Sequence, residues 1–128
     1  MASAPHPRVS PLPALRARLW IESSGHAAMT EAGADLLEQI LVTNSLSEAA
    51  RRLRFSYRRA WMLVDAMNAR WPQPLVQTAV GGKKGGGTHV TEYGRIVLRS
   101  YRDLQVQLDL LLDSATKPFQ IATRAARR

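Results

Sequence analysis

The sequence contains no cysteine, which excludes disulfide bonds and metal sites built from thiolates. A chain without cysteine is compatible with the cytoplasm, where we expect this protein to act. Histidine is also scarce, and His6, His26 and His89 lack the close spacing of metal ligands. We therefore predict neither a metal site nor a cofactor.

Long hydrophobic runs and acidic residues are scarce too. The longest uncharged apolar run falls far short of the ~18 residues that a membrane helix needs, so we expect a soluble protein that does not span a membrane. Only ten Asp and Glu stand against 18 Lys and Arg. Few carboxylates and isolated histidines provide no catalytic constellation, and we predict that the protein is not an enzyme.

The positive charge lies in one segment. Between Ser45 and Arg102, eleven lysine and arginine residues stand against three acidic residues, which equals the net charge of +8 of the whole chain. A basic segment of this kind indicates a polyanionic partner, either nucleic acid or an anionic membrane surface. Composition alone does not choose between the two.

The hydrophobic pattern predicts one folded domain. Period-two alternation indicates a strand over residues 15–22, and helical spacing indicates helices over 31–43, 45–54 and 56–70. Strands 75–80 and 89–90 form a hairpin, and a last helix runs from Thr91 to Asp113. The predicted helix N-caps are Thr30, Ser45, Ser56 and Thr91, and Ser45 with Glu48 has the spacing of a reciprocal capping box.

Read together, these elements predict an α+β, mostly helical fold: a winged helix-turn-helix with a β-hairpin wing and a long C-terminal dimerisation helix. The domain covers residues 15–113 of the 128. The proline-rich residues 1–14 are predicted to be disordered, and residues 114–128 form a flexible basic tail. The surplus apolar face of the last helix, from Leu104 onward, is a candidate dimer seam.

The helices over 45–54 and 56–70 have the order and lengths of a helix-turn-helix, whose second helix presents its N-terminal residues to the major groove. Arg58 and Arg59 suit that position because a guanidinium can donate two hydrogen bonds to guanine, or one to a phosphate. A solvated helix face is the alternative, which the surrounding charge disfavours. Trp61 either stacks near DNA or closes the core, and we favour the core.

The loop Gly81–Gly87 invites a nucleotide-binding interpretation, but a P-loop requires Gly-Lys-Ser/Thr at the start of a helix, and that order is missing. As a wing, its glycines allow close approach to the DNA backbone while Lys83 and Lys84 neutralise phosphates. A flexible solvent loop is the alternative. The predicted DNA-binding residues are Ser45, Ser47, Ser56, Tyr57, Arg58, Arg59, Trp61, Met62, Lys83, Lys84, Gly85, Gly86 and Thr88.

Three segments together resemble the N-terminal DNA-binding domain of the ModE family of molybdate-responsive transcriptional regulators, a winged helix-turn-helix related to that of LysR-type regulators. They are SLSEAA at 45–50, FSYRRAW at 55–61 with Met67-Asn68, and GGKKGGGTHVTEYG at 81–94. The similarity covers residues 15–112. It implies double-stranded DNA as partner and a homodimer held by the first and last helices, for which we predict Leu36, Ile40, Tyr101, Leu104, Leu108 and Leu111.

The sequence departs from the family at its C-terminus. Members of the family that sense molybdate carry it in small β-barrel domains after the long helix, and this chain has about 15 residues beyond Asp113. We therefore expect the DNA-binding half without the C-terminal molybdate-binding domains, and a separate effector-binding protein is a candidate partner. The alternatives in other classes are a winged-helix docking module and a non-specific architectural DNA binder.

Overall fold

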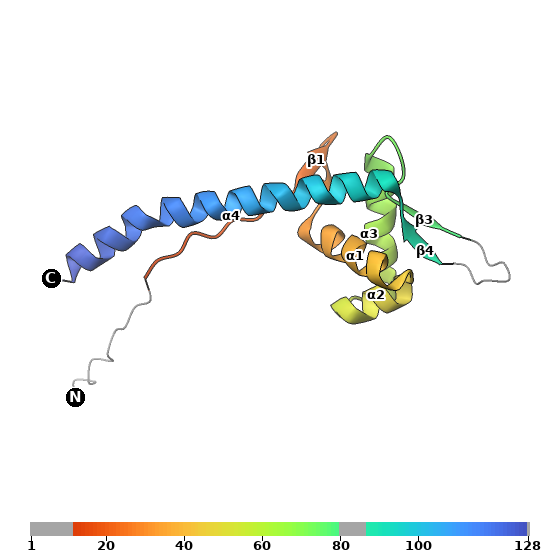
Figure 1. Ribbon diagram of the computed structural model, residues 1–128, viewed down its shortest axis with the longest axis horizontal. Coiled ribbons are helices and arrows are strands. Elements are labelled where there is room, and N and C mark those ends of the chain that lie inside the picture. Colours follow the sequence, from red (N-terminus) through yellow and green to blue (C-terminus); the bar gives the residue numbers. More distant parts are fainter. Residues whose placement is uncertain (1–11, 80–86, 128) are drawn as a thin grey trace, which may run out of the picture. The chain divides into compact units, whose positions relative to one another are not determined.

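The computed structural model describes residues 12–79 and 87–127 and shows an α+β chain that is mostly helical (Figure 1). The described part contains two antiparallel hairpins and four helices. The strands are β1 (Ile21–Ser23), β2 (His26–Met29), β3 (Val76–Thr78) and β4 (Thr88–Val90). The helices are α1 (Glu31–Thr43), α2 (Leu46–Leu53), α3 (Tyr57–Arg70) and α4 (Glu92–Ala126).

The chain divides into two compact units, of which Arg18–Val106 contains both hairpins, α1, α2, α3 and the first part of α4. The other unit consists of residues 1–17 and 107–128. Most of the residues that we predicted to be disordered lie outside the described residues. The predicted flexible tail, by contrast, is helical as far as Ala126, because α4 does not end at Asp113.

All four predicted helix N-caps are confirmed. The side-chain oxygens of Thr30, Ser45, Ser56 and Thr91 each accept a hydrogen bond from the backbone N–H three residues further on, at 2.9–3.2 Å. Each cap satisfies one of the backbone donors that a helix N-terminus leaves without an intrahelical partner. The predicted bounds of α1 are also those of the structure.

The capping box at the start of α2 is only half formed, which corrects our prediction. Ser45 Oγ accepts from Glu48 N, but the backbone N–H of Ser45 donates to Thr43 Oγ1 at 3.3 Å. The Glu48 carboxylate instead pairs with the guanidinium groups of Arg51 and Arg52 on the next turn of the helix. Two cations one turn away compete successfully with a single backbone N–H for the same carboxylate.

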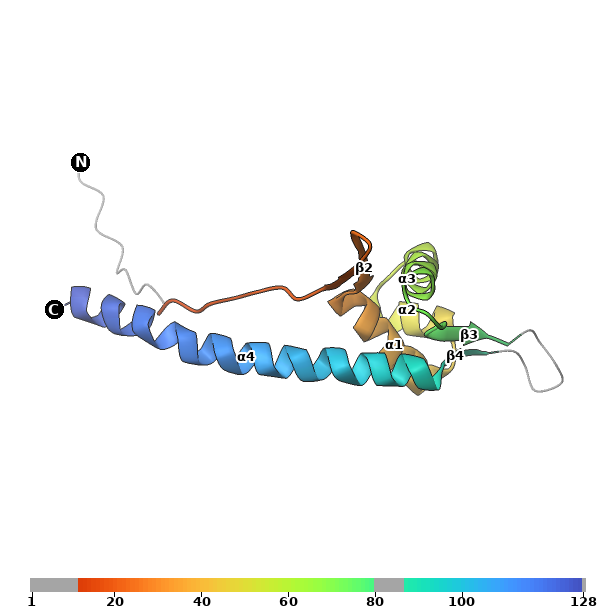
Figure 2. The same cartoon turned by 90° about the horizontal axis from the view of Figure 1, so that it is seen from above.

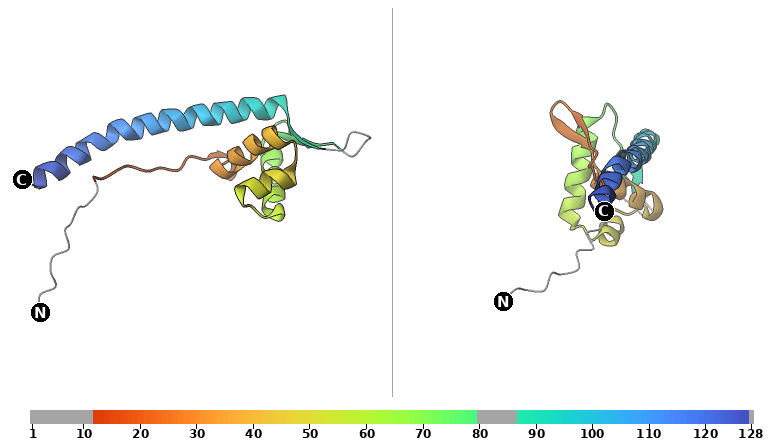
Figure 3. Two further views of the ribbon diagram at one scale, coloured as in Figure 1. Left: turned by 60° about the horizontal axis from the view of Figure 1, so that its bottom comes forward. Right: turned by 90° about the vertical axis from the view of Figure 1, so that its left-hand side faces the viewer.

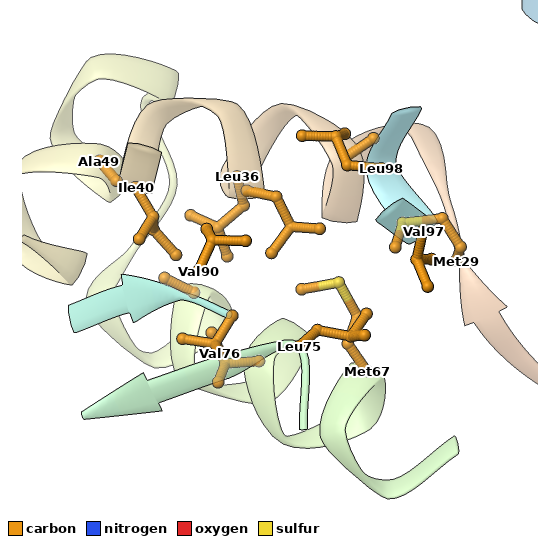
Figure 4. Close-up of a cluster of buried hydrophobic side chains, with 14 of the residues drawn as sticks. Met29, Leu36, Ile40, Ala49, Met67, Leu75, Val76, Val90, Val97 and Leu98 are labelled. Carbon is orange, nitrogen blue, oxygen red and sulfur yellow. The ribbon is translucent and has the colours of Figure 1, made fainter. Parts of the chain in front are cut away.

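The core lies where α1, α2 and α3 pack against each other (Figure 2), with β2 beside α3 and β4 beside α1 (Figure 3). Leu36, Leu37 and Ile40 on α1 have no exposed surface. Figure 4 shows this cluster, in which side chains from both strands of the β3–β4 hairpin and from α4 meet those of α1. Its labelled members are Met29, Leu36, Ile40, Ala49, Met67, Leu75, Val76, Val90, Val97 and Leu98.

Polar contacts hold the first part of α4 against α1. The Arg102 guanidinium donates to the carboxylates of Asp35 (2.7 Å) and Glu38 (2.6 Å) on α1. Burial by itself would lower the pKa of Arg102, but its hydrogen bonds to Glu38 and Asp35 outweigh burial and raise that pKa. The guanidinium is therefore charged at any pH at which the protein is folded, and the α1–α4 contact does not depend on its titration.

The predicted strand over residues 15–22 is wrong except at its end, because residues 12–20 have no regular secondary structure and β1 begins at Ile21. The backbone of this segment finds side-chain partners instead of a neighbouring strand. Leu19 O accepts from the buried Tyr101 hydroxyl at 2.7 Å, and Leu15 N donates to Thr116 Oγ1 at 3.2 Å. Of the apolar residues in the alternating pattern, Leu15 and Ala17 are exposed and only Leu19 and Ile21 are half-buried, so the alternation marks neither a ladder nor a continuous packed face.

No helix among residues 12–79 and 87–127 is long and apolar enough to cross a membrane.

The first turn of α4 passes so close to the chain before β3 that only glycine fits at position 94. A Cβ on Gly94 would overlap the Leu75 carbonyl oxygen and lie 2.8 Å from Val90 Cγ1. The same Leu75 oxygen accepts the Thr91 backbone N–H at 2.9 Å, so it cannot move without breaking that bond.

We expect Gly94→Ala to lower the free energy of unfolding by about 1–3 kcal/mol, because the added methyl group forces backbone apart. Urea denaturation followed by circular dichroism measures this change. Ser100→Ala, an exposed substitution on the same helix, is the control and should stay within about 0.5 kcal/mol of the wild type. Equal stability of the two variants would contradict the close approach.

Candidate nucleic-acid interface

The turn between α2 and α3 is tight. Arg54 adopts the left-handed conformation (φ 57°), and its backbone N–H returns to Arg51 O at 3.1 Å. Phe55 N donates to Ala50 O at 2.9 Å, and Ser56 then begins α3 as its N-cap. Because three residues separate the two helices, the direction of α3 is determined by the packing of α2.

The N-terminal turns of α3 present their side chains to solvent. Tyr57 is 54% exposed and Met62 61% exposed, and Arg58 between them is exposed as well. Arg58 makes no hydrogen bond or ion pair with any residue that the structure describes. Its five N–H donors are therefore available to an external acceptor.

Arg59 and Trp61 are held by neighbouring aromatic side chains. The Arg59 guanidinium lies 4.0 Å from the centroid of the Phe55 ring, a cation–π contact. Trp61 is half-buried against the core and meets Tyr57 edge to face, with ring centroids 6.2 Å apart. The structure thus separates the two arginines that the sequence treated alike, since Arg59 is stacked on Phe55 and Arg58 has no such contact with a described residue.

The basic residues of α2 are partly neutralised within the helix. The hydrogen bond from Arg51 lowers the pKa of the Glu48 carboxyl, and the charge of Arg52 acts in the same direction. Glu48 is therefore ionised at neutral pH and compensates one of the two cations. Arg54, at the end of α2, is exposed and has no such carboxylate among the described residues.

The β3–β4 hairpin is short and depends on the helices for its placement. It has three residue pairs, from Val76↔Val90 to Thr78↔Thr88. The Asn68 side chain on α3 donates to Val76 O at 3.0 Å and accepts from the backbone N–H groups of Leu75 and Val76. One amide thus ties the first strand of the hairpin to the same helix that presents Arg58.

Beside this hairpin lies a hollow of about 270 Å³, between the start of α2, the start of α3, the end of β3 and the start of β4. It brings together four of the predicted DNA-binding residues, which are far apart in the sequence: Ser45, Ser47, Tyr57 and Thr88. Ser45 Oγ and Ser47 Oγ lie 3.1 Å apart. Hydroxyl groups that converge in this way can donate to the oxygens of an anion.

The remaining predicted contacts have different placements. Ser56 is exposed, and its hydroxyl oxygen accepts from Arg59 N as the N-cap of α3, which leaves its O–H able to donate to another group. Thr88 lines the hollow yet is only 6% exposed. Lys83, Lys84, Gly85 and Gly86 lie outside the described residues.

The predicted dimerisation residues fall into two groups. Leu36, Ile40 and Tyr101 have no exposed surface and belong to the core of a single chain. On α4, Leu104 is 45% exposed, Leu111 is 63% exposed and Leu108 is half-buried. Only the second group has exposed surface that could contact another copy. The sequence did not separate the groups, because an apolar stripe at helical spacing can face either the core or a partner.

Sequence reasoning missed Asn44 and the role of Asn68. Asn44 ends α1 in the left-handed conformation (φ 52°), and its backbone oxygen accepts from Thr88 N at 3.1 Å. The sequence did contain a signal for this helix end. Asparagine is among the few non-glycine residues that adopt the left-handed conformation readily, and Asn44 stands directly before the N-cap of the next helix. For Asn68, only the fold shows that its amide meets the chain before β3.

Comparison with known proteins gives the chain clear relatives. It is 37% identical over 97 residues to the molybdenum transport protein ModE of Azotobacter vinelandii, covering 76% of this chain and 36% of that protein. It is 35% identical over 98 residues to the DNA-binding transcriptional dual regulator ModE of Escherichia coli K12 (73% and 37%). It is 38% identical over 86 residues to the molybdenum-pterin-binding protein MopB of Rhodobacter capsulatus (67% and 32%).

Its homologues are transcriptional regulators and molybdenum-binding proteins of the ModE family. The chain spans less than half the length of these relatives. None of the three names is that of an enzyme. No protein-family model matches the chain.

Proposed function

We propose that this chain is a sequence-specific DNA-binding transcriptional regulator with a ModE-like winged helix-turn-helix, in which α2 and α3 form the helix-turn-helix and the β3–β4 hairpin carries the wing. The observation that carries the proposal is the arrangement around α3. Arg58, which has no hydrogen bond or ion pair among the described residues, and exposed Met62 project from its N-terminal turns, beside a hollow lined by hydroxyl groups. The names of the homologues support a role in transcription regulation.

In this proposal the parts have different tasks. Arg58 and Met62 reach base edges in the major groove, where donor and acceptor patterns differ between base pairs. Ser45, Ser47 and Tyr57 donate to phosphate oxygens at the edge of the groove, and Lys83 and Lys84 neutralise the flanking backbone. Thr88, which is buried, supports the hairpin, and Arg59 is held by its contact with Phe55.

We also propose a connection with molybdenum, which rests on the homologues alone. Their names mention molybdenum transport and molybdenum-pterin binding, and no residue of this chain is assigned to molybdate. Selection of bound sequences from random duplexes, performed with and without molybdate, tests both parts of the proposal. An enriched motif supports sequence-specific binding, and a molybdate-dependent motif would require an effector site.

We expect Arg58→Ala to weaken binding to the selected sequence by about 1–3 kcal/mol and to weaken binding to random DNA much less, because a guanine contact is sequence-dependent. Fluorescence anisotropy with both duplexes measures the difference. Arg70→Ala, which removes the same charge about 18 Å further along α3, is the control. Equal losses on both duplexes would make Arg58 a phosphate contact.

We expect the double variant Lys83→Ala/Lys84→Ala to flatten the slope of log K against log[salt] by about two units, since each lysine that neutralises a phosphate releases about one counterion. Titrations at several salt concentrations give the slope. Lys117→Ala, on the C-terminal part of α4, should leave it unchanged. If the slope of the double variant matches that of the wild type, the wing lysines do not contact DNA.

The homodimer is proposed through α4, where Leu104, Leu108 and Leu111 recur at helical spacing and Leu104 and Leu111 are exposed. We expect Leu104→Glu/Leu111→Glu to convert a dimer into a monomer, because buried carboxylates without partners oppose association. Size-exclusion chromatography with light scattering measures the mass. Val106→Glu changes an exposed residue at a different angular position on α4 and should remain dimeric. A wild type that is monomeric at micromolar concentration would contradict the proposed dimer interface on α4.

A further inference from the structure

Asn44 lies where three elements meet. It ends α1, its backbone N–H donating to Ile40 O at 2.7 Å, and it directly precedes Ser45, the N-cap of α2. Its backbone oxygen accepts from Thr88 N, at the first residue of β4. One residue therefore joins the end of α1 and the start of α2 to the second strand of the hairpin.

The side chain of Asn44 makes a second contact with the same strand. His89 Nδ1 lies 3.2 Å from Asn44 Oδ1. An amide oxygen only accepts hydrogen bonds, so the imidazole Nδ1–H is the donor. Both groups are at the surface, and no other side-chain hydrogen bond of either residue occurs among the described residues. Because this bond lies at the surface, we expect it to affect the direction of the hairpin more than the stability of the core.

The backbone approaches closely at this point. A Cβ on Gly87 would lie 3.0 Å from Asn44 O and 3.1 Å from His89 Nε2. Gly87 O also accepts from Ala79 N at 2.8 Å, which closes the described part of the hairpin. The contacts of Asn44 thus lie at the end of the hairpin nearest the loop.

The hairpin needs such a contact because two short strands do not hold a direction by themselves. At its other end, Asn68 binds Val76 and Thr91 binds the Leu75 carbonyl oxygen. Those bonds hold the start of β3 and the end of β4, and the end nearest the loop depends on Asn44. A hairpin held at one end only can swing about that end.

We propose that Asn44 and His89 are a positioning pair that sets the direction of the β3–β4 hairpin relative to α2 and α3, so that the hairpin and α3 engage DNA together. This inference rests on the proposed DNA-binding function. In this inference the two residues affect contacts with the flanking DNA backbone by orienting the hairpin, and Asn44 also lines the hollow beside Ser45 and Ser47. Asn44 and His89 act through the wing, and Arg58 acts independently of them.

The test is a double-mutant cycle on a random-sequence DNA duplex. Asn44→Gly removes the side chain but permits the left-handed backbone and the backbone bonds to Ile40 and Thr88. His89→Ala removes the partner at an exposed position. We expect each variant to weaken binding by about threefold to tenfold, the effect of losing one hydrogen bond, and the double variant to lose no more than either single one.

The salt dependence separates positioning from stability. In the Asn44→Gly background, Lys83→Ala/Lys84→Ala should flatten the slope of log K against log[salt] by less than it does in the wild type, because the wing lysines no longer reach the phosphates. In the absence of DNA, the Thr88 backbone amide should exchange its hydrogen faster in both variants. The melting temperature of His89→Ala should stay close to that of the wild type.

Three results would overturn the inference in distinguishable ways. Additive losses of affinity in the double variant would contradict the positioning pair, and so would an undiminished effect of the lysine substitutions on the salt slope in Asn44→Gly. Either result would leave the proposed DNA binding itself intact. A wild type that does not bind the duplex would remove both the pair's role and the proposed function. If Asn44→Gly proves unstable, the same salt titration is made in the His89→Ala background. An undiminished effect of Lys83→Ala/Lys84→Ala on the slope there would overturn the inference.

Discussion

The buried stripe of α1 is the constraint on which the rest of the molecule depends. Leu36, Leu37 and Ile40 have no exposed surface, and α2, α3 and β4 all contact this helix. Arg102 adds an ion-pair contact between α1 and the first part of α4. Because burial of apolar area is the main favourable contribution to folding, the position of every element near the candidate interface follows from how it covers α1.

Short connections join the elements of the candidate interface to this core. Three residues join α2 to α3, so the exposed N-terminal turns of α3 have their direction set by the core on the opposite side of the helix. The hairpin is different, since its three residue pairs cannot hold its direction. Asn68 and Asn44 supply that direction from α3 and from the end of α1.

Much of the local structure could be predicted from the sequence. The N-caps at Thr30, Ser45, Ser56 and Thr91 were recognisable because a cap is decided by residues within one turn of it. Where several partners compete for one group, local reasoning failed. Glu48 pairs with Arg51 and Arg52 instead of the Ser45 N–H. The alternating pattern over residues 15–22 has a strand partner only from Ile21 onward, and residues 15–20 have no regular secondary structure.

The sequence by itself determined where the helices begin, their caps, the concentration of positive charge and the likeness to ModE proteins, because these depend on neighbours along the chain. Only the tertiary structure decided which side chains are available. It separated Arg58, which has no partner among the described residues, from stacked Arg59, and buried Leu36 and Ile40 from exposed Leu111. Helical periodicity identifies an apolar face, but whether the protein's own core covers that face depends on residues distant in sequence.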